Sequence, residues 1–354
     1  MFRLGNIQDC LFKEEINKKM NKLVKISVGV TTYNQQDTIA QTLDSILSQK
    51  GDFALELVLG EDCSLDSTYA ICCDYAKRFP NIIRLLPNTH NLGIMANCSR
   101  VMQACTGEYL GMCAGDDYWC DEYKLQKQLE YFIAHPEVGV VSTAGYQLLV
   151  KSNRLVPNAV DPIHPIKDGN IKPFYFSLSY MGGVYATPLT LLIKREVFKY
   201  VDLNEFVIRK FPVEDFPMQA ILAQHTLWGH ISDLCVVYRV YKESATFISF
   251  DHPNYLQYHI GLANIRRYLN ELYPEDACFT EEQLQEQVFY KEFLMYLHQL
   301  DYQRAKKIIT NVSQLIHNSS KVNQAKKITK TWLYFAIFHL YKEYQYGKYL
   351  KKKT

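Results

Sequence analysis

Short apolar runs alternate with helix-patterned segments along residues 25–120, and this alternation most limits what the chain can fold into. Four runs have the length and composition of buried strands, at 26–31, 55–59, 82–86 and 109–114. The segments between them repeat apolar side chains at helical spacing, which predicts helices. Alternating strands and helices build a largely parallel sheet that is covered on both faces. We therefore predict an α/β fold for this part of the chain.

Polar side chains gather where three of these strands end. The clusters are Thr32-Tyr33-Asn34, Glu61-Asp62 and Asp116-Asp117. Parallel α/β sheets bind ligands beyond the carboxyl ends of their strands, so we expect one site at this edge. Adjacent carboxylates such as Asp116 and Asp117 repel each other unless a cation or donor groups hold them. Hard divalent cations prefer oxygen ligands and often share them with substrate phosphates. By itself, an Asp-Asp turn after a strand is more often a solvated loop.

The pattern changes twice further along the chain. After residue 120 we predict a strand at 138–141, an irregular insertion at 147–180, a helix at 186–200 and a late strand at 231–241. From about residue 252 the pattern is helical, with few Gly or Pro residues. The predicted organisation is an N-terminal extension (1–24), a sheet domain (25–250) and an all-helical C-terminal region (251–354).

Composition narrows the class of protein. The formal net charge of +2 argues neither for nor against a nucleic-acid partner, and we expect none. The ten cysteines include no C-x-x-C pair, so neither a zinc signature nor a disulfide scaffold is indicated. Reduced, buried cysteines are typical of a cytoplasmic protein. No apolar stretch reaches the roughly 18 residues of a transmembrane helix, and no signal peptide is evident.

Five motifs follow one another within residues 25–120. They are VGVTTYN (28–34), EDCSLDST (61–68), NLG (91–93), GEY (107–109) and AGDDYW (114–119). In this order they resemble the opening strand, the D-x-S-x-D-x-T loop, the N-x-G turn, the G-E-Y strand and the metal motif of glycosyltransferase family 2. Weaker matches continue to about residue 250, and residues 251–354 match no family that we can name. The resemblance implies a GT-A (Rossmann-like) fold, with 25–120 binding a nucleotide-sugar and 121–250 facing the acceptor.

The resemblance also implies a role for each matching residue. Tyr33 would stack on a uracil ring and Asp62 would accept its N–H, which favours a UDP-sugar donor. Asp117 would ligate Mn²⁺ or Mg²⁺, which neutralises charge on the departing nucleoside diphosphate. The full set of implied nucleotide-sugar contacts is Thr32, Tyr33, Asn34, Asp62, Asn91, Asp116 and Arg239.

The resemblance places the catalytic base in an E-D pair before a helix. Val213-Glu214-Asp215-Phe216-Pro217 fits, which implies that Asp215 takes the proton of the acceptor hydroxyl and that the anomeric configuration inverts. The alternative for Asp215 is ordinary capping of that helix. Tyr238-Arg239-Val240-Tyr241 resembles a late Y-R-V-H strand, with Tyr241 in place of His.

Two departures from the family pattern concern the donor. Ala114-Gly115 stands where relatives often carry a further carboxylate, and the Arg that often follows the N-x-G turn is absent, with Asn97-Cys98-Ser99 in that region. Neither departure removes the implied metal ligand or the implied base.

The end of the chain is basic and aromatic. Nine lysines and one acid lie from Lys321 onward, and residues 332–341 are apolar nearly all round. Two placements stay open for this segment: a helix at an anionic membrane surface, or a core helix packed against the catalytic domain. The first would suit a lipid-linked saccharide acceptor in bacterial-type surface polysaccharide assembly, with the protein at the inner face of the membrane. A free saccharide acceptor suits either placement.

Three alternative functions can be compared with the sequence. A sugar-phosphate nucleotidyltransferase would need a Gly-rich, basic loop after the first strand, and Thr32-Tyr33-Asn34-Gln35-Gln36 has no Gly, Lys or Arg. A dinucleotide-binding enzyme is excluded because no G-x-G-x-x-G follows a strand, and no P-loop is present. A catalytically inactive partner subunit with a GT-A fold is the main alternative, and the presence of both Asp117 and Asp215 argues against it.

Overall fold

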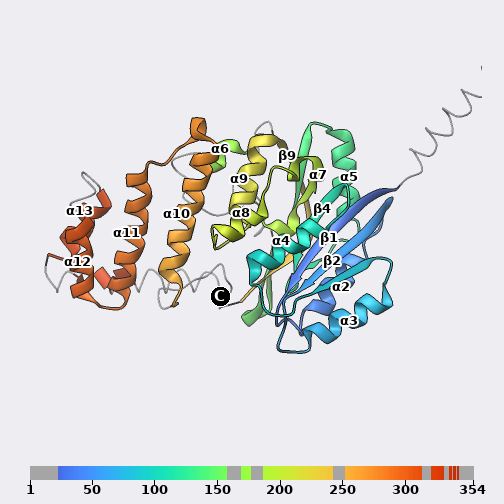
Figure 1. Ribbon diagram of the computed structural model, residues 1–354, viewed down its shortest axis with the longest axis horizontal. Helices are drawn as coiled ribbons and strands as arrows, with labels where there is room; N and C mark the ends of the chain where they lie inside the picture. Colours follow the sequence, from blue (N-terminus) through green and yellow to red (C-terminus); the bar gives the residue numbers. More distant parts are fainter. Residues whose placement is uncertain are drawn as a thin grey trace, which may run out of the picture. The chain divides into compact units, whose positions relative to one another are not determined.

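The computed structural model describes most of the chain as two compact units (Figure 1). The described residues are 23–157, 169–176, 186–241, 252–312, 320–330, 335–336, 338–339 and 341–342. The first unit comprises residues up to Thr143 together with Pro188–Lys199 and Gly229–Val236. The second comprises Ala144–Thr187, Tyr200–Trp228 and Val237 onward. The predicted bounds at 24/25, 120/121 and 250/251 stay predictions.

The first unit is built on a parallel sheet of the predicted strands. These are β1 (Val24–Thr32), β2 (Phe53–Glu61), β3 (Ile83–Pro87) and β4 (Tyr109–Ala114), which lie in the order β3-β2-β1-β4. The predicted helices between them are α2 (Ile39–Leu47), α3 (Thr68–Arg78) and α4 (Ile94–Ala104). Helix α4 packs closely on the sheet, because a Cβ added to Gly60 would lie 2.2 Å from a methyl carbon of Val101. The prediction of an α/β fold with a mostly parallel sheet is confirmed.

Beyond β4 the sheet becomes antiparallel, and one prediction proves wrong. In place of the predicted helix at 186–200, these residues form a 3₁₀ turn η2 (Pro188–Thr190), strand β8 (Leu192–Lys194) and a single helical turn α7 (Arg195–Phe198). Strand β8 pairs antiparallel with both β4 and β6 (Val138–Leu149). Leu192 and Ile193 are fully buried there, and pairing on both sides satisfies their backbone groups. The sheet then continues through β9 (Leu227–Val240) to β5 (Tyr118–Trp119), and α5 (Lys124–Ala134) follows β5 in the chain.

The predicted irregular insertion at 147–180 begins as regular structure. Strand β6 runs on to Leu149, a 3₁₀ turn η1 (Val150–Ser152) follows, and β7 (Arg154–Pro157) pairs back onto β6. A short helix α6 (Lys172–Tyr175) lies later in the segment. Residues 158–168 and 177–185 lie outside the described part of the chain.

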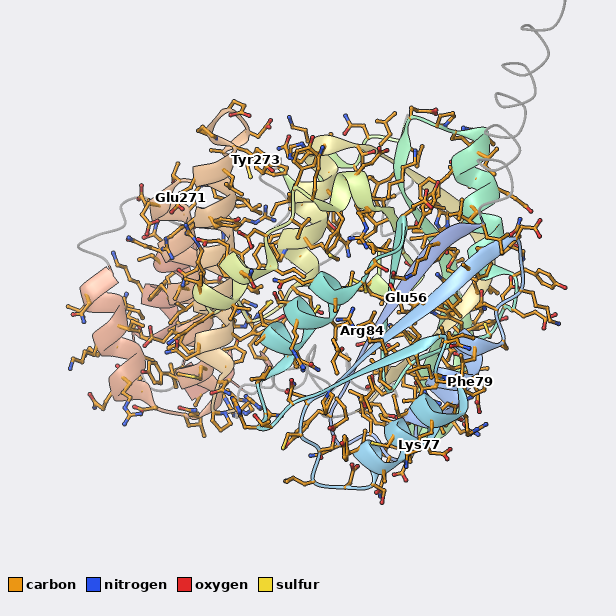
Figure 2. All side chains as sticks on the ribbon, turned by 45° about the vertical axis from the view of Figure 1, so that its right-hand side comes forward. Glu56, Lys77, Phe79, Arg84, Glu271 and Tyr273 are labelled. Atoms are coloured by element: carbon orange, nitrogen blue, oxygen red, sulfur yellow. The ribbon has the colours of Figure 1, made fainter. Side chains whose placement is uncertain are left out.

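The second unit is mainly helical, as predicted from residue 252 onward. Its helices are α6, α8 (Leu203–Ile208), α9 (Asp215–His225), α10 (Tyr255–Leu272), η3 (Pro274–Asp276), α11 (Glu281–His298), α12 (Tyr302–Val312) and α13 (Ser320–Ile328). In Figure 2, Lys77 and Phe79 mark the end of α3, while Glu271 and Tyr273 mark the end of α10. Every described helix is too short or too polar to span a bilayer.

The apolar segment at 332–341 is partly described, and among its described residues Phe335 lies in the core of this helical region while Tyr341 is 54% exposed. Phe335 is fully buried and contacts the rings of Phe293 and Tyr302. His339 lies 2.8 Å from the backbone oxygen of Leu297. These contacts join Phe335 and His339 to α11 and α12 of the helical region, and the two predicted placements, against the catalytic domain or at a membrane surface, stay predictions.

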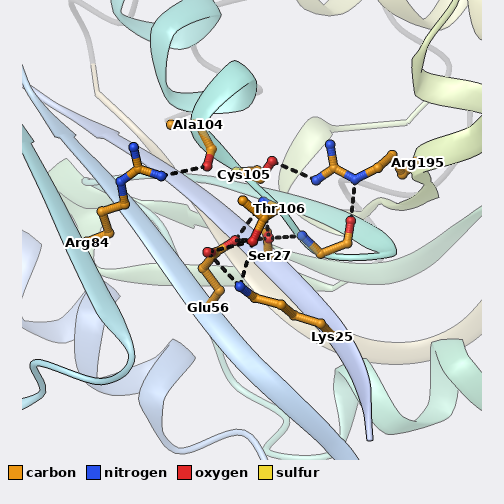
Figure 3. Close-up of polar contacts among 9 residues, drawn as sticks. Lys25, Ser27, Glu56, Arg84, Ala104, Cys105, Thr106 and Arg195 are labelled. Carbon is orange, nitrogen blue, oxygen red and sulfur yellow. Dashed lines mark hydrogen bonds and ion pairs between the residues drawn. The ribbon is translucent and has the colours of Figure 1, made fainter. Parts of the chain in front are cut away.

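A polar cluster joins the amino-terminal ends of β1 and β2 to the loop before β4 (Figure 3). The Glu56 carboxylate accepts hydrogen bonds from Lys25 Nζ (2.8 Å), Thr106 N (2.7 Å) and the Ser27 hydroxyl. Burial alone would raise the pKa of Glu56, but these hydrogen bonds outweigh it and lower the pKa to about 2. Arg195 Nη2 donates to Cys105 O at 2.7 Å, which fixes the loop from its other side. The cluster lies at the opposite ends of the strands from the predicted site and is structural.

Candidate active site

The turn after β1 is joined to the acidic loop after β2 by hydrogen bonds in both directions. The backbone N–H of Asn34 donates to Ser64 Oγ at 2.9 Å, and Asn34 Oδ1 accepts from Leu65 N at 2.8 Å. Asn34 has a φ of +52°, a left-handed conformation that Asn tolerates better than most residues. The two predicted clusters are therefore one structural element at the carboxyl edge of the sheet.

The remaining polar residues of the acidic loop bind the same turn. Gln35 N donates to Thr68 Oγ1 at 2.8 Å, and Gln36 N donates to Asp66 Oδ2 at 3.2 Å. In return, Ser67 N donates to Gln36 Oε1 at 3.0 Å. The spacing of the D-x-S-x-D-x-T motif thus places its Ser, second Asp and Thr side chains against successive backbone groups of the turn.

Asp62 is buried and holds the N-x-G turn. Its Oδ1 accepts from Leu92 N (2.8 Å) and its Oδ2 from Gly93 N (2.9 Å), while its backbone oxygen accepts from Asn91 Nδ2 (3.1 Å). Asn88 Nδ2 also donates to Oδ1, so three of the carboxylate's roughly four lone-pair positions are used and one remains for a ligand. Tyr33 is 41% exposed at the same edge. The predicted contacts of Tyr33, Asp62 and Asn91 with a nucleotide stay predictions.

The Asp116-Asp117 corner is fixed by close contacts with the first turn and with α2. Gly115 N donates to Thr31 O at 2.9 Å, and the Thr42 hydroxyl donates to Asp117 O at 2.6 Å. A Cβ added to Gly115 would lie 2.7 Å from Thr32 Oγ1, so only glycine fits. Thr32 is buried at the end of β1, and its hydroxyl donates to Gln35 Oε1 at 2.8 Å. Thr32, Asp116 and Asp117 therefore share one edge with the joined loops.

The donor set suits a metal that a ligand also coordinates. In the described residues, no group of three or more His, Cys, Asp or Glu side chains could hold a metal ion by itself. Asp117 is 3% exposed and Asp116 is half-buried beside it. One or two carboxylates together with substrate phosphates is a common way to bind Mg²⁺. The residues present fit such a shared site.

Asp215 and Glu214 form a half-buried acidic pair at the start of α9 in the second unit. Burial raises the pKa of Asp215, the neighbouring Glu214 raises it further, and the result is about 7 despite a 2.7 Å bond from Phe216 N to Asp215 Oδ1. Burial likewise raises the pKa of Glu214. The N-cap of α9 is Glu214, so Asp215 does not occupy the capping position. A carboxyl group with a pKa near 7 suits a general base at neutral pH.

Arg239 lies near the end of β9 and also belongs to the second unit. It is 8% exposed, and Tyr241 follows two residues later. The sequence-predicted site residues thus divide between the units: Asp215 and Arg239 in the second, and Thr32, Tyr33, Asn34, Asp62, Asn91, Asp116 and Asp117 in the first.

Sequence reasoning missed Asn88 and Arg100. Asn88 Nδ2 donates to Asp62 Oδ1 at 2.7 Å, and Arg100 donates to Asn88 Oδ1 and to Pro87 O (3.2 Å). The available signal was position, because Asn88 directly follows β3 and so marks a fourth polar strand end at the same edge. Although no Arg directly follows the N-x-G turn, Arg100 reaches this region from α4.

This geometry agrees with the family comparison. Residues 27–180 match the model of glycosyl transferase family 2. The chain therefore contains a glycosyltransferase family 2 domain with a GT-A fold. Sequence relatives include the putative glycosyltransferase EpsE of Bacillus subtilis, 32% identical over 146 residues that cover 40% of this chain and 52% of that protein. The uncharacterized protein Rv1520 of Mycobacterium tuberculosis is 40% identical over 115 residues, which cover 32% of this chain and 33% of that protein.

A solved structure shows the same fold over most of the chain. It is S. aureus TarS 1–349 in complex with UDP-GlcNAc, with a TM-score of 0.53, 14% sequence identity, and coverage of 91% of this chain and 92% of that one. By contrast, the chain spans about a third to a half of the length of the two curated sequence relatives above.

Proposed function

We propose that the chain is an inverting, metal-dependent glycosyltransferase that moves a sugar from a UDP-sugar to a hydroxyl group. One observation carries the proposal: the first turn, the acidic loop and the N-x-G turn are joined through Asn34 and Asp62 at the edge where Asp117 lies. Three polar loops that were unrelated in function would not be expected to be joined to one another by hydrogen bonds at a single edge of the sheet. The match of residues 27–180 to family 2 supports the same function.

The donor would lie along this edge. Tyr33, which is exposed, would stack on the uracil ring, and Asp62 would accept its N–H with its remaining lone pair. Thr32, Asn34, Asn91 and Asp116 would shape the pocket, and Arg239 would approach the diphosphate. Asp117 would hold Mn²⁺ or Mg²⁺, which when bound neutralises charge on the diphosphate leaving group.

The chemical step would be a single displacement. Asp215 takes the proton of the acceptor hydroxyl, and that oxygen forms a bond to the anomeric carbon of the donor. The bond from that carbon to the diphosphate oxygen breaks, and its electron pair leaves with UDP. Attack from the face opposite the leaving group inverts the anomeric configuration. NMR of the product from an α-linked donor tests this step: a β-linkage supports it, and an α-linkage contradicts it.

The names of relatives support a role in bacterial surface polysaccharide assembly. The poly(ribitol-phosphate) beta-glucosyltransferase of Bacillus spizizenii is 31% identical over 106 residues, covering 29% of this chain and 16% of that protein. We propose an acceptor of this general kind, either a saccharide or a lipid-linked saccharide.

A lipid-linked acceptor would place the protein at the inner face of a membrane. The exposed side of α12 and of the segment around α13 carries lysines that would suit an anionic surface: Lys306, Lys307, Lys326, Lys327 and Lys330. Sedimentation with phosphatidylglycerol liposomes tests this, using a variant with these five lysines changed to Gln. Equal sedimentation of the two proteins would contradict the placement.

The decisive experiment is calorimetry of UDP binding with and without Mn²⁺. We expect binding that requires Mn²⁺, that is lost in Asp117→Ala, and that persists in Asp52→Ala, an exposed carboxylate just before β2. Failure of UDP to bind the wild type under either condition would contradict the UDP-sugar proposal. That result would favour the inactive partner subunit or another nucleotide donor.

A further inference from the structure

The Asn88 side chain links a buried carboxylate to a cation. Its Nδ2 donates to Asp62 Oδ1 at 2.7 Å, and its Oδ1 accepts a hydrogen bond from Arg100 Nη1. Asn88 directly follows β3, and its backbone N–H donates to Glu61 O at 3.1 Å. A neutral amide therefore lies between a guanidinium and a carboxylate, and both of these side-chain hydrogen bonds are charge-assisted.

The neighbours of the amide determine which way it faces. Arg100 has only donors, so the amide oxygen faces it. Asn97 Oδ1, an acceptor, lies 3.3 Å from Asn88 Nδ2 and faces the amide nitrogen instead. The orientation of Asn97 is fixed in turn, because it is 2% exposed and its Nδ2 donates to Gly60 O at 2.9 Å. All of these contacts agree with an Asn88 N–H that points at Asp62.

Arg100 also holds the chain segment that carries Asn88. Its guanidinium, half-buried on α4, donates to Leu86 O at 3.3 Å and to Pro87 O at 3.2 Å. Together with the bond to Asn88 Oδ1, these contacts join three successive residues at the end of β3 to α4. Removal of the guanidinium would release this segment from α4 and leave Asn88 Oδ1 without its charged donor.

The two oxygens of the Asp62 carboxylate differ in what they can offer a ligand. Oδ1 accepts from Leu92 N (2.8 Å) and from Asn88 Nδ2, so its two lone pairs are used. Oδ2 accepts one bond within the described part of the chain, from Gly93 N at 2.9 Å, which leaves one lone pair. An ionised carboxylate accepts and cannot donate, so Oδ2 selects a ligand that presents an N–H. Uracil has such an N–H between its two carbonyl groups, whereas the corresponding ring nitrogen of cytosine is an acceptor.

We propose that Arg100 is a positioning residue for selection of the nucleobase: through Asn88 it fixes Asp62 so that Oδ2 alone is open to a base N–H. The inference rests on the proposed function, because the base belongs to the proposed UDP-sugar donor. The charge of Arg100 polarises the Asn88 amide and strengthens the hydrogen bond from that amide to Asp62. Arg100 acts through Asn88 and not by contact with the donor.

Calorimetry of the full chain with UDP and with CDP, both in the presence of Mn²⁺, tests this role. Arg100→Met should weaken UDP binding by about tenfold or more, as for loss of a charged hydrogen bond, and should change CDP binding little. Arg100→Lys, which keeps a charged donor, should recover most of the affinity for UDP.

The matched control is Arg84→Met, which should bind UDP as the wild type does. Arg84 is an exposed arginine of β3 that also bonds to α4, since its Nη1 donates to Ala104 O at 3.2 Å (Figure 3). Ala104 is the last residue of α4, at the opposite end of that helix from the N-x-G turn.

A double-mutant cycle separates positioning from a general loss of structure. Asn88→Ala should weaken UDP binding by itself, and Arg100→Met should have little further effect in that variant, because the path to Asp62 is already broken. Binding of inorganic pyrophosphate with Mn²⁺ should be the same in all of these variants, since pyrophosphate has no base.

The outcomes separate this role from the proposed function. Additive losses from Arg100→Met and Asn88→Ala, equal losses of UDP and pyrophosphate binding, or wild-type binding of UDP by Arg100→Met would overturn the positioning role. Each of these results would leave the UDP-sugar donor standing. Failure of UDP to bind the wild type would contradict that donor and the role of Arg100 with it. Non-additive loss of UDP binding alone, with recovery in Arg100→Lys, would support both inferences.

Discussion

At the scale of single residues, burial decides the chemistry of Asp215. The start of a helix normally favours the ionised carboxylate, by about 0.3–1 kcal/mol near the surface. Burial and the charge of the adjacent Glu214 favour the protonated carboxyl and outweigh the effect of the helix start, since the pKa of Asp215 rises to about 7. A shift of this size exceeds what a helix end supplies.

This pKa sets the expected pH dependence of catalysis. Below about pH 7 Asp215 holds a proton and cannot act as a base, so kcat/KM should rise as the pH increases through about 7. Asp215→Asn should lower kcat by about 10²-fold or more and leave UDP binding unchanged. Steady-state rates across pH 5–9 check this, with the exposed Glu282→Gln as the control. A flat profile would argue against Asp215 as the base.

The same shift predicts that the inactive variant is the more stable one. The ordinary pKa of this carboxyl is 3.8, and the folded value is about 7, so the folded state binds the proton more tightly. At pH 8 the charge is buried at a cost, and Asp215→Asn should raise the free energy of unfolding by on the order of 1–3 kcal/mol. The gain should fade as the pH falls from 7 towards 4. Urea unfolding at pH 8 and pH 4.5 measures it, and destabilisation at pH 8 would contradict the burial argument.

At the scale of elements, Arg266 joins three helices around the base. It is buried on α10, its guanidinium lies 4.5 Å from the ring centroid of Phe216 on α9, and it donates to the backbone oxygen of Tyr175 on α6. The Tyr175 hydroxyl in turn donates to Gln219 Oε1 of α9 at 2.8 Å. Phe216 directly follows Asp215, so this contact network holds the turn that carries the base.

Replacement of two adjacent arginines of α10, Arg266 and Arg267, should lower the free energy of unfolding by very different amounts. Arg266→Leu should lower the free energy of unfolding by about 2–4 kcal/mol, because it leaves buried partners without the guanidinium. Arg267 forms an ion pair with Glu281 at the surface, with an N–O distance of 2.6 Å. Arg267→Leu should therefore lower the free energy of unfolding by no more than about 1 kcal/mol. Chemical denaturation of the two variants measures the difference. Equal costs would show that the Arg266 contacts contribute little.

At the scale of the whole molecule, the order of strands and the position of the polar loops follow from one rule. Parallel strands place all their carboxyl ends at one edge, and here β1, β2, β3 and β4 deliver Thr32, Asp62, Asn88 and Asp117 to it. The amino-terminal ends carry the Glu56 cluster, which ties the same strands together at the far edge (Figure 3). One edge is available for ligands, and the other stabilises the sheet.

Glu56 should make the stability of the first unit depend on acid. Its folded pKa of about 2 lies below the ordinary 4.5, so its contribution is complete above about pH 5 and is lost as the pH falls towards 2. With the side chain 13% exposed, we expect Glu56→Gln to cost about 2 kcal/mol at pH 7 and much less near pH 2. Urea unfolding of both proteins at the two pH values measures this. A cost independent of pH would point to packing rather than to charge.

The sequence by itself determined the parts that depend on local pattern. Apolar runs alternating with helical spacing identified β1 to β4 and the helices between them, because period and length are properties of neighbouring residues. Rules of parallel sheets then located Thr32, Asn34, Asp62 and Asp117 at one edge without coordinates. The order of motifs identified the family.

Only the tertiary structure decided the parts that depend on partners distant in the chain. Strand β8 is a strand because β4 and β6 pair with it, although residues 186–200 resemble a helix on their own. The bonds of Asp62 to the N-x-G turn and the raised pKa of Asp215 both require knowledge of what surrounds each group. Strand pairing and the desolvation of ionisable groups depend on the assembled fold, whereas the periodicity of apolar residues depends only on residues that are neighbours in the sequence.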